Sequence, residues 1–236
     1  MLFVSQAARC CVLKNLKKAL INQLRTRLTD PGARGTATSD SFNGTGAALT
    51  FTLTNKPLMC VTSVTVGGVS QKLNSDYFID FGTSADYAII TFASAPGVGT
   101  NNVVVSYKHG VNWVYDDQPH AEAQMPRISV LNVGGEGEIS GGVGDQIVIL
   151  APVFRIGAWV KGGDTYTISG EKYSGSKLLD FLVTNLQDTI RAIRLNQDIA
   201  FLIDLQCGEP TYLGLDEEYK IKRCEILVKA RYQKNY

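Results

Sequence analysis

The sequence predicts an α+β protein in which an antiparallel sheet is flanked by two helices and a small all-β domain is inserted after the first helix. Three observations carry this prediction. Two segments, near 5–28 and 174–195, repeat leucine and isoleucine at helical spacing. Strand-like runs with alternating apolar residues lie on both sides of the second segment. Between 49 and 107, five short apolar runs are separated by turn residues.

The first helix is predicted from residue 5 to residue 28, because Pro31 and Gly32 stop it shortly afterwards. Its apolar stripe consists of five leucines, namely Leu13, Leu16, Leu20, Leu24 and Leu28. Basic residues fill its other faces: Lys14, Lys17, Lys18, Arg25 and Arg27. Two interpretations stay open, a solvated face that keeps the helix soluble and a docking surface for an acidic partner.

Charge is distributed unevenly, although the net charge of the whole chain is only +1. Residues 1–35 carry seven basic residues and one acidic residue, whereas residues 116–236 carry thirteen basic and seventeen acidic residues. A protein of this balance is not expected to bind nucleic acid over its whole surface. Its basic end is instead suited to an acidic neighbour.

The middle of the chain is predicted to form a small sandwich or barrel between two connectors, 35–48 and 111–126. The connectors are rich in Gly, Ser and Thr or interrupted by proline. The predicted strands are Leu49–Thr54, Val61–Val66, Tyr77–Phe81, Tyr87–Phe92 and Val103–Tyr107. The predicted domains are therefore a discontinuous α+β domain, 1–35 and 119–236, and an inserted β domain, 36–118.

The C-terminal half is predicted as two strands, a helix and two further strands. The strands are Ile128–Val133, Val153–Lys161, Ile199–Leu205 and Cys224–Tyr232. The apolar side of the second strand is predicted to carry Phe154, Ile156, Ala158 and Val160, and the inward side of the last strand Ile226, Val228, Ala230 and Tyr232. The helix begins at Ser174 or Ser176, which are expected to cap it, and runs to about Leu195. Its predicted apolar stripe consists of Leu178, Leu182, Leu186, Ile190 and Ile193. One face of the third strand is predicted to carry Ile199, Phe201, Ile203 and Leu205. Because such a sheet needs a second covering helix, the N-terminal helix is predicted to pack on it.

No catalytic, metal or cofactor motif is found in the sequence, and we do not expect an enzyme. The segment 173–177 (YSGSK) is no nucleophile elbow, and 134–142 (GGEGEISGG) matches a dinucleotide fingerprint only loosely. Five cysteines show no repeated spacing and the two histidines lie far from them, so no zinc site is predicted. The acidic run 216–219, with Asp204 and Glu209, has carboxylates suited to Mg²⁺ or Ca²⁺, but a solvated turn is the favoured interpretation. Neither a signal peptide nor a membrane span is expected.

Several segments together resemble the tail terminator proteins of long-tailed bacteriophages. They are the leading helix LKNLKKALINQLRTRL, the strands MPRISVLNV and FRIGAWVK, the helix YSGSKLLDFLVTNL and the closing strand in DEEYKIKRCEILVKARYQ. The middle of the chain resembles the small Ig-like β-sandwich modules that recur in phage virion proteins, as in VTVGGVSQKLNSDYFIDF. The resemblance covers about 1–30 and 125–236 and depends on the order of the elements.

The resemblance implies a structural virion protein that forms a homo-oligomeric ring, a hexamer in that family, at the head-proximal end of the tail. Its implied partners are copies of itself, the tail tube protein, the head–tail connector and genomic DNA passing near the lumen. It implies assembly in the host cytoplasm and neither a cofactor nor a membrane. The glycine-rich segment 134–144 suits an arm that orders on assembly. The expected interface residues are Lys14, Lys17, Lys18, Arg25, Gly135, Gly137, Gly141, Gly142, Arg155, Lys161, Lys229 and Arg231.

The alternative interpretation is an adhesin or carbohydrate-binding module at a baseplate or capsid surface. Three tyrosines of the middle segment, Tyr77, Tyr87 and Tyr107, are candidates for stacking on sugars. On alternating strands such residues are more often part of the core. A ring in solution would favour the first function, and a monomer or trimer with glycan affinity the second.

Overall fold

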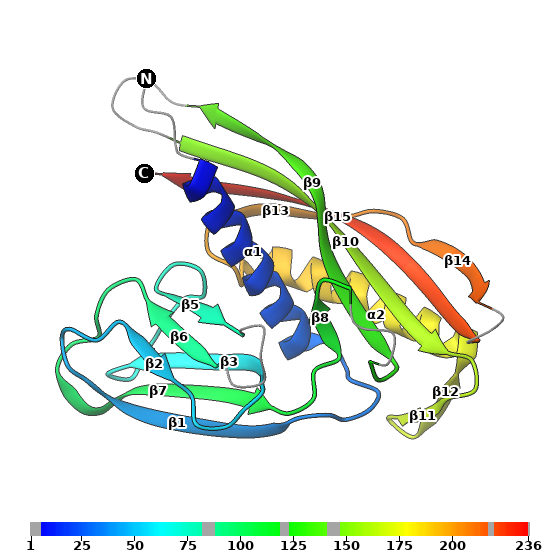
Figure 1. Cartoon of the computed structure of the whole chain (residues 1–236), viewed down its shortest axis with the longest axis horizontal. Coiled ribbons are helices and arrows are strands. Elements are labelled where there is room, and N and C mark those ends of the chain that lie inside the picture. The colour runs from blue at the N-terminus through cyan, green and yellow to red at the C-terminus, as the bar shows by residue number, and fades with distance from the viewer. Residues whose placement is uncertain (1–5, 82–87, 119–122, 141–146, 217–219, 236) are drawn as a thin grey trace. The chain divides into compact units, whose positions relative to one another are not determined.

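The structure is a computed structural model of the whole chain, and its described residues form mostly β-strands together with two α-helices (Figure 1). It describes the backbone of residues 6–81, 88–118, 123–140, 147–216 and 220–235, and the side chains of 13–81, 88–118, 123–135, 149–214 and 220–233. The chain divides into two compact units. Unit 1 comprises 1–26, 34–112 and 198–200, and unit 2 comprises 27–33, 113–197 and 201–236.

Unit 1 contains helix α1 and two antiparallel sheets. The helix is Gln6–Arg27, as the leucine spacing predicts. A four-stranded sheet has the order β1-β7-β3-β4, and a three-stranded sheet has the order β2-β6-β5. The strands are β1 Thr36–Gly44, β2 Thr50–Thr52, β3 Leu58–Val66, β4 Val69–Ser70, β5 Tyr77–Asp80, β6 Ile89–Phe92 and β7 Gly99–His109.

Side chains of the two sheets of unit 1 share one core. Phe42 of β1 contacts Phe51 of β2 with ring centroids 5.3 Å apart, and Phe51 meets Phe92 of β6 edge to face at 5.6 Å. Tyr107 of β7 is buried, and its hydroxyl donates a hydrogen bond of 3.0 Å to Asp40 Oδ2. Aromatic contacts between two sheets of this kind bury large apolar areas and fix how the sheets pack.

Helix α1 is held in unit 1 by buried polar contacts with β3. Asn22 Nδ2 donates to the Val61 carbonyl at 2.9 Å, and the Val61 N–H donates to Asn22 Oδ1 at 2.8 Å. Arg25 donates to the Met59 carbonyl at 2.9 Å. The structure therefore differs from the predicted grouping, in which this helix packs on the C-terminal sheet. The leucine stripe indicates that the helix packs against something, but a stripe carries no information about its partner.

Unit 2 contains helix α2 and a six-stranded sheet. The main order is β13-β15-β10-β9-β8, and β14 also pairs with β15. All pairs in this sheet are antiparallel except β8 with β9. The strands are β8 Val114–Asp116, β9 Arg127–Ser140, β10 Ile147–Lys161, β13 Leu202–Cys207, β14 Thr211–Asp216 and β15 Ile221–Asn235, and a separate hairpin consists of β11 Thr165–Ile168 and β12 Glu171–Ser174.

Helix α2, Gly175–Asn196, lies against β10, β13 and β15. Its predicted stripe is confirmed, because all five of its members are buried: Leu178, Leu182, Leu186, Ile190 and Ile193. The predicted inward residues of the two long strands are buried as well: Phe154, Ile156, Ala158 and Val160 of β10, and Ile226, Val228, Ala230 and Tyr232 of β15. Ser174 occupies the N-cap position, but its side chain makes no capping hydrogen bond, and Ser176 Oγ instead contacts Lys222 Nζ at 2.6 Å.

The connector 35–48, predicted without strands, and the glycine-rich segment 134–144, predicted as a loop or a hairpin, both contain strand residues. Most of the connector 35–48 forms β1, which pairs with β7 from Thr36 to Gly44. Residues 134–140 of the glycine-rich segment belong to β9 and pair with β10. The remainder of that segment, 141–144, lies outside the described residues. Backbone hydrogen bonds to long neighbouring strands stabilise these segments in spite of their low β-propensity.

Candidate functional site

The face of the unit 2 sheet opposite α2 is the strongest candidate for a functional surface. Along β10 and β15 the residues covered by α2 alternate with residues that point to the other face. Lys229 and Arg231 of β15 are exposed on that face, two residues apart. An extended strand separates such positions by about 7 Å.

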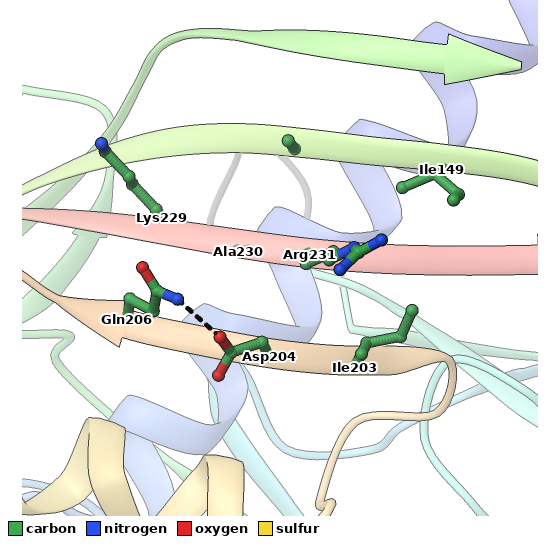
Figure 2. Close-up of a pocket in the computed structure, with 8 residues that line it drawn as sticks. Ile149, Ile203, Asp204, Gln206, Lys229, Ala230 and Arg231 are labelled. Atoms are coloured by element: carbon green, nitrogen blue, oxygen red, sulfur yellow. Dashed lines mark hydrogen bonds between the residues drawn. The ribbon is translucent and has the colours of Figure 1, made fainter.

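A depression of about 620 Å³ lies on this face, where β13, β15 and β10 run side by side. It is lined by Ile149, Ala151, Ile203, Asp204, Gln206, Lys229, Ala230 and Arg231. Figure 2 shows Lys229 and Arg231 on the central β15 ribbon, between Ile149 of β10 and the three labelled residues of β13.

The carboxylate in this depression is already engaged. Asp204 Oδ2 accepts a hydrogen bond of 2.8 Å from Gln206 Nε2, drawn as the dashed line in Figure 2, and Asp204 Oδ1 accepts one of 2.9 Å from the Leu205 N–H. Arg194 of α2 adds an ion pair at 3.8 Å. Among the described side chains, by contrast, no carboxylate lies within 4.0 Å of the Lys229 or Arg231 nitrogens. Within the described part of the chain, the depression therefore offers two cations without a carboxylate partner.

Apolar side chains surround these cations. Ile203, which lines the depression, is 49% exposed, and Leu227, two residues before Lys229 on β15, is 47% exposed. An antiparallel sheet with one face in water normally presents polar residues there. Exposed apolar side chains gathered beside unpaired cations are typical of a surface that meets another macromolecule.

The position of Ile203 corrects the predicted register of the third strand. Ile199 and Leu205 are buried as predicted, whereas Phe201 and Ile203 are exposed. A register shift between Leu202 and Asp204 interrupts the pairing of β13 with β15. Such a bulge changes which residues face the core, and simple alternation in the sequence does not show it.

Farther along the same sheet, a ladder of aromatic and charged residues is paired within the chain. Arg127 and Arg223 flank the Trp159 ring, with their guanidinium carbons 5.2 and 4.8 Å from its centroid. Burial lowers the pKa of Arg127. Arg155 and Arg223 each lie 3.8 Å from the Glu225 carboxylate. Arg155, an expected interface residue, is therefore engaged within the chain, while Lys161 at the end of β10 is exposed.

The expected basic surface of α1 is largely used inside unit 1. Arg25 is buried, and its guanidinium lies 4.5 Å from the Phe81 ring centroid. Lys18 forms an ion pair with Asp80, and only 11% of its side chain is exposed. Lys17 is half-buried, and Lys14 is exposed. Long lysine and arginine side chains can reach past an apolar stripe to polar groups beside it. The position of these residues on the helix therefore did not predict which groups they contact.

Two of the expected interface glycines, Gly135 and Gly137, are part of the paired backbone of β9. Gly135 has a φ of 143°, and a Cβ there would lie 2.4 Å from the Pro152 Cα. Gly137 pairs with Leu150. Gly141 and Gly142 lie outside the described residues.

Lys229 and Arg231, which line the depression, are among the expected interface residues, whereas the residues around them are not. Gln206 and Leu227 received no role, Ile203 was placed only on an apolar face of its strand, and Asp204 was considered only as a metal ligand. The exposed apolar position of Leu227, between Glu225 and Lys229 on the outward side of β15, was the one available signal.

Two of the tyrosines proposed to stack on sugars are buried. Tyr77 is 5% exposed and Tyr107 is 1% exposed, so both belong to the core of unit 1. Tyr87 lies outside the described residues. The described part of unit 1 thus gives the carbohydrate-binding alternative no exposed ring at these positions.

Comparison with protein-family models finds no match for this chain, and comparison with curated proteins finds none either. No helix in the described part of the chain is long and apolar enough to cross a membrane. Among the described residues, no group of three or more His, Cys, Asp or Glu side chains is arranged to hold a metal ion.

Proposed function

We propose that this chain is a structural virion protein of a long-tailed bacteriophage, which assembles with copies of itself into a ring at the head-proximal end of the tail. In this role it caps the tail tube, joins the head connector and surrounds the path of the DNA. It acts as a non-enzymatic subunit that assembles in the host cytoplasm and remains in the virion.

The observation that carries the proposal is the outward face of the unit 2 sheet, where exposed apolar side chains surround Lys229 and Arg231. A subunit that exists only in water has no need of such a face. A ring subunit needs it, because each copy buries surface against two neighbours. The order of elements in unit 2, with two long strands, a helix and a closing strand, supports a terminator-like α+β unit, and unit 1 is proposed to be an Ig-like sandwich to which α1 is added.

The proposal is tested by the mass and shape of the purified protein. Native mass spectrometry and negative-stain electron microscopy are expected to show a closed ring of about six copies of the 25.6 kDa chain. Ile203→Asp places a charge on the apolar face and is expected to raise the protein concentration needed for assembly more than tenfold. Leu195→Asp is the matched control, since Leu195 of α2 is 67% exposed and lies outside this face.

A monomer at every concentration would contradict the proposal. So would a monomer or trimer that binds glycans, because that result supports the adhesin. Equal loss of assembly in both variants would show that the outward face has no special part in it.

A further inference from the structure

The two ends of the unit 2 sheet carry opposite charge. In the strand order β13-β15-β10-β9-β8, Lys229 and Arg231 lie at the β13–β15 end. Asp116 and Asp117 lie at the β8 end, and both are exposed. One sheet thus presents a pair of cations near one end and a pair of carboxylates at the other.

The acidic end is fixed in place by the fold. Trp113 and Val114 are buried, and β8 pairs in parallel with β9 through Val114 and Ile128. The Asp117 N–H donates to the Val130 carbonyl at 3.1 Å, and Asp117 has a φ of 83°. No cation among the described side chains lies within 4.0 Å of the Asp117 carboxylate. Asp116 and Asp117 are therefore exposed on an edge strand whose backbone is anchored to β9.

We propose that the β13–β15 face of one copy receives the Asp116–Asp117 edge of the next copy. This inference rests on the proposed ring, and it names the two surfaces that meet. A contact between different surfaces is heterologous, so every subunit offers both halves of it and the contact repeats until the ring closes. Ile149 and Ile203 line the depression beside the cations, and they remove water from the ion pairs, which strengthens them relative to pairs in open solvent.

A second copy fits this face better than nucleic acid does. The Asp204 carboxylate and the exposed Ile203 side chain lie among the cations. Binding to a phosphate backbone depends on an array of cations that together neutralise many phosphates. A protein surface with two carboxylates and an apolar surround matches the mixed character of the depression.

The test uses two variants of the full chain with opposite changes. The acidic-face variant is Lys229→Glu with Arg231→Glu, and the basic-edge variant is Asp116→Lys with Asp117→Asn, since asparagine tolerates a positive φ. Each variant alone brings like charges together at every contact, and we expect its assembly to need more than a tenfold higher concentration. An equimolar mixture pairs the acidic face of one variant with the basic edge of the other, and a six-membered ring with alternating subunits is expected to form.

Two controls separate this effect from misfolding and from net charge. Trp113 and Trp159 both belong to unit 2, so unchanged tryptophan emission shows that this unit is folded in each variant. Lys56→Glu with Lys172→Glu changes the net charge as much as the acidic-face variant does. Both of these lysines are exposed and lie outside the depression, and this control is expected to assemble like the original protein.

Each remaining outcome overturns the inference in a distinguishable way. If both variants assemble like the original protein, the ring stands and these surfaces are not its contacts. If folded variants fail both alone and mixed, the two surfaces do not meet each other. If the original protein binds a DNA fragment through Lys229 and Arg231 while ring formation survives their reversal, the occupant of the face is nucleic acid. If the original protein never assembles, the proposed function fails as well.

Discussion

Asn22 supplies β3 with the two backbone partners that a neighbouring strand supplies elsewhere. Its amide accepts from the Val61 N–H and donates to the Val61 carbonyl, and its side chain is 1% exposed. The pairing of β3 with β7 shifts register between Val61 and Ser63, beside this contact. A buried backbone group without a partner costs about 1–3 kcal/mol. One helix side chain thus allows an irregular strand to be buried.

Replacing this side chain tests that role directly. Asn22→Leu leaves the Val61 N–H and carbonyl without partners, and we expect the free energy of opening of β3 to fall by about 2–4 kcal/mol. Hydrogen exchange of the peptide 58–66, followed by mass spectrometry, measures the change. Lys14→Ala on the exposed side of the same helix is the control and is expected to leave exchange unaltered. Equal exchange in the two variants would show that the amide is dispensable.

At the scale of elements, β9 and β10 form a long pair with a register shift at Val133, two residues before Gly135. Gly135 pairs with Pro152, and the shift lies between Val153 and Phe154 of β10. A side chain at 135 would meet the Pro152 Cα at 2.4 Å and the Ala151 carbonyl oxygen at 2.5 Å. Its φ of 143° also disfavours any residue with a Cβ. Two independent constraints therefore require glycine here.

Gly135→Ala is expected to destabilise unit 2 by about 2–4 kcal/mol, because it adds a steric clash to backbone strain. Urea unfolding followed by tryptophan emission measures the loss, since Trp113 and Trp159 report this unit. The matched control is Gly163→Ala, where an added Cβ meets nothing within 4 Å and the φ is not in the left-handed region. A midpoint for Gly135→Ala equal to that of the control would mean that the bulge adjusts freely.

Elements with strong periodicity could be predicted from the sequence, and elements defined by their neighbours could not. The stripe of α2 and the alternation of β10 and β15 arise from burial on one face, which leaves a regular pattern. In contrast, β1, β8, β11, β12 and β14 are short, polar or glycine-containing, and they are strands because a partner strand satisfies their backbone. The candidate site was found in part for the same reason: Lys229 and Arg231 follow the regular β15 pattern, whereas Ile203 follows a bulge.

At the scale of the whole molecule, the sequence predicted a division into two parts but not the part to which α1 belongs. The buried residues of α1 include Leu16, Leu20, Ile21 and Leu24, and its buried polar contacts are made with β3 of unit 1. Unit 2 contains the apolar stripe of α2, both tryptophans and every strand of the six-stranded sheet. Removing α1 together with the strands of unit 1 is therefore expected to destabilise the rest of the chain less than removing those strands alone.

Residues 113–236 expressed alone are expected to unfold cooperatively in urea, with near-ultraviolet circular dichroism like that of a packed core. The matched deletion removes 34–112 and joins residues 33 and 113 through a Gly-Ser linker. It keeps α1 without β3, so it exposes four large apolar side chains that are worth about 1.5–3 kcal/mol each when buried, and it is expected to aggregate or bind a hydrophobic dye. The opposite result would be a molten 113–236 fragment and a well-packed linker deletion. It would assign α1 to the C-terminal sheet, because only that sheet remains in the linker deletion to bury the helix.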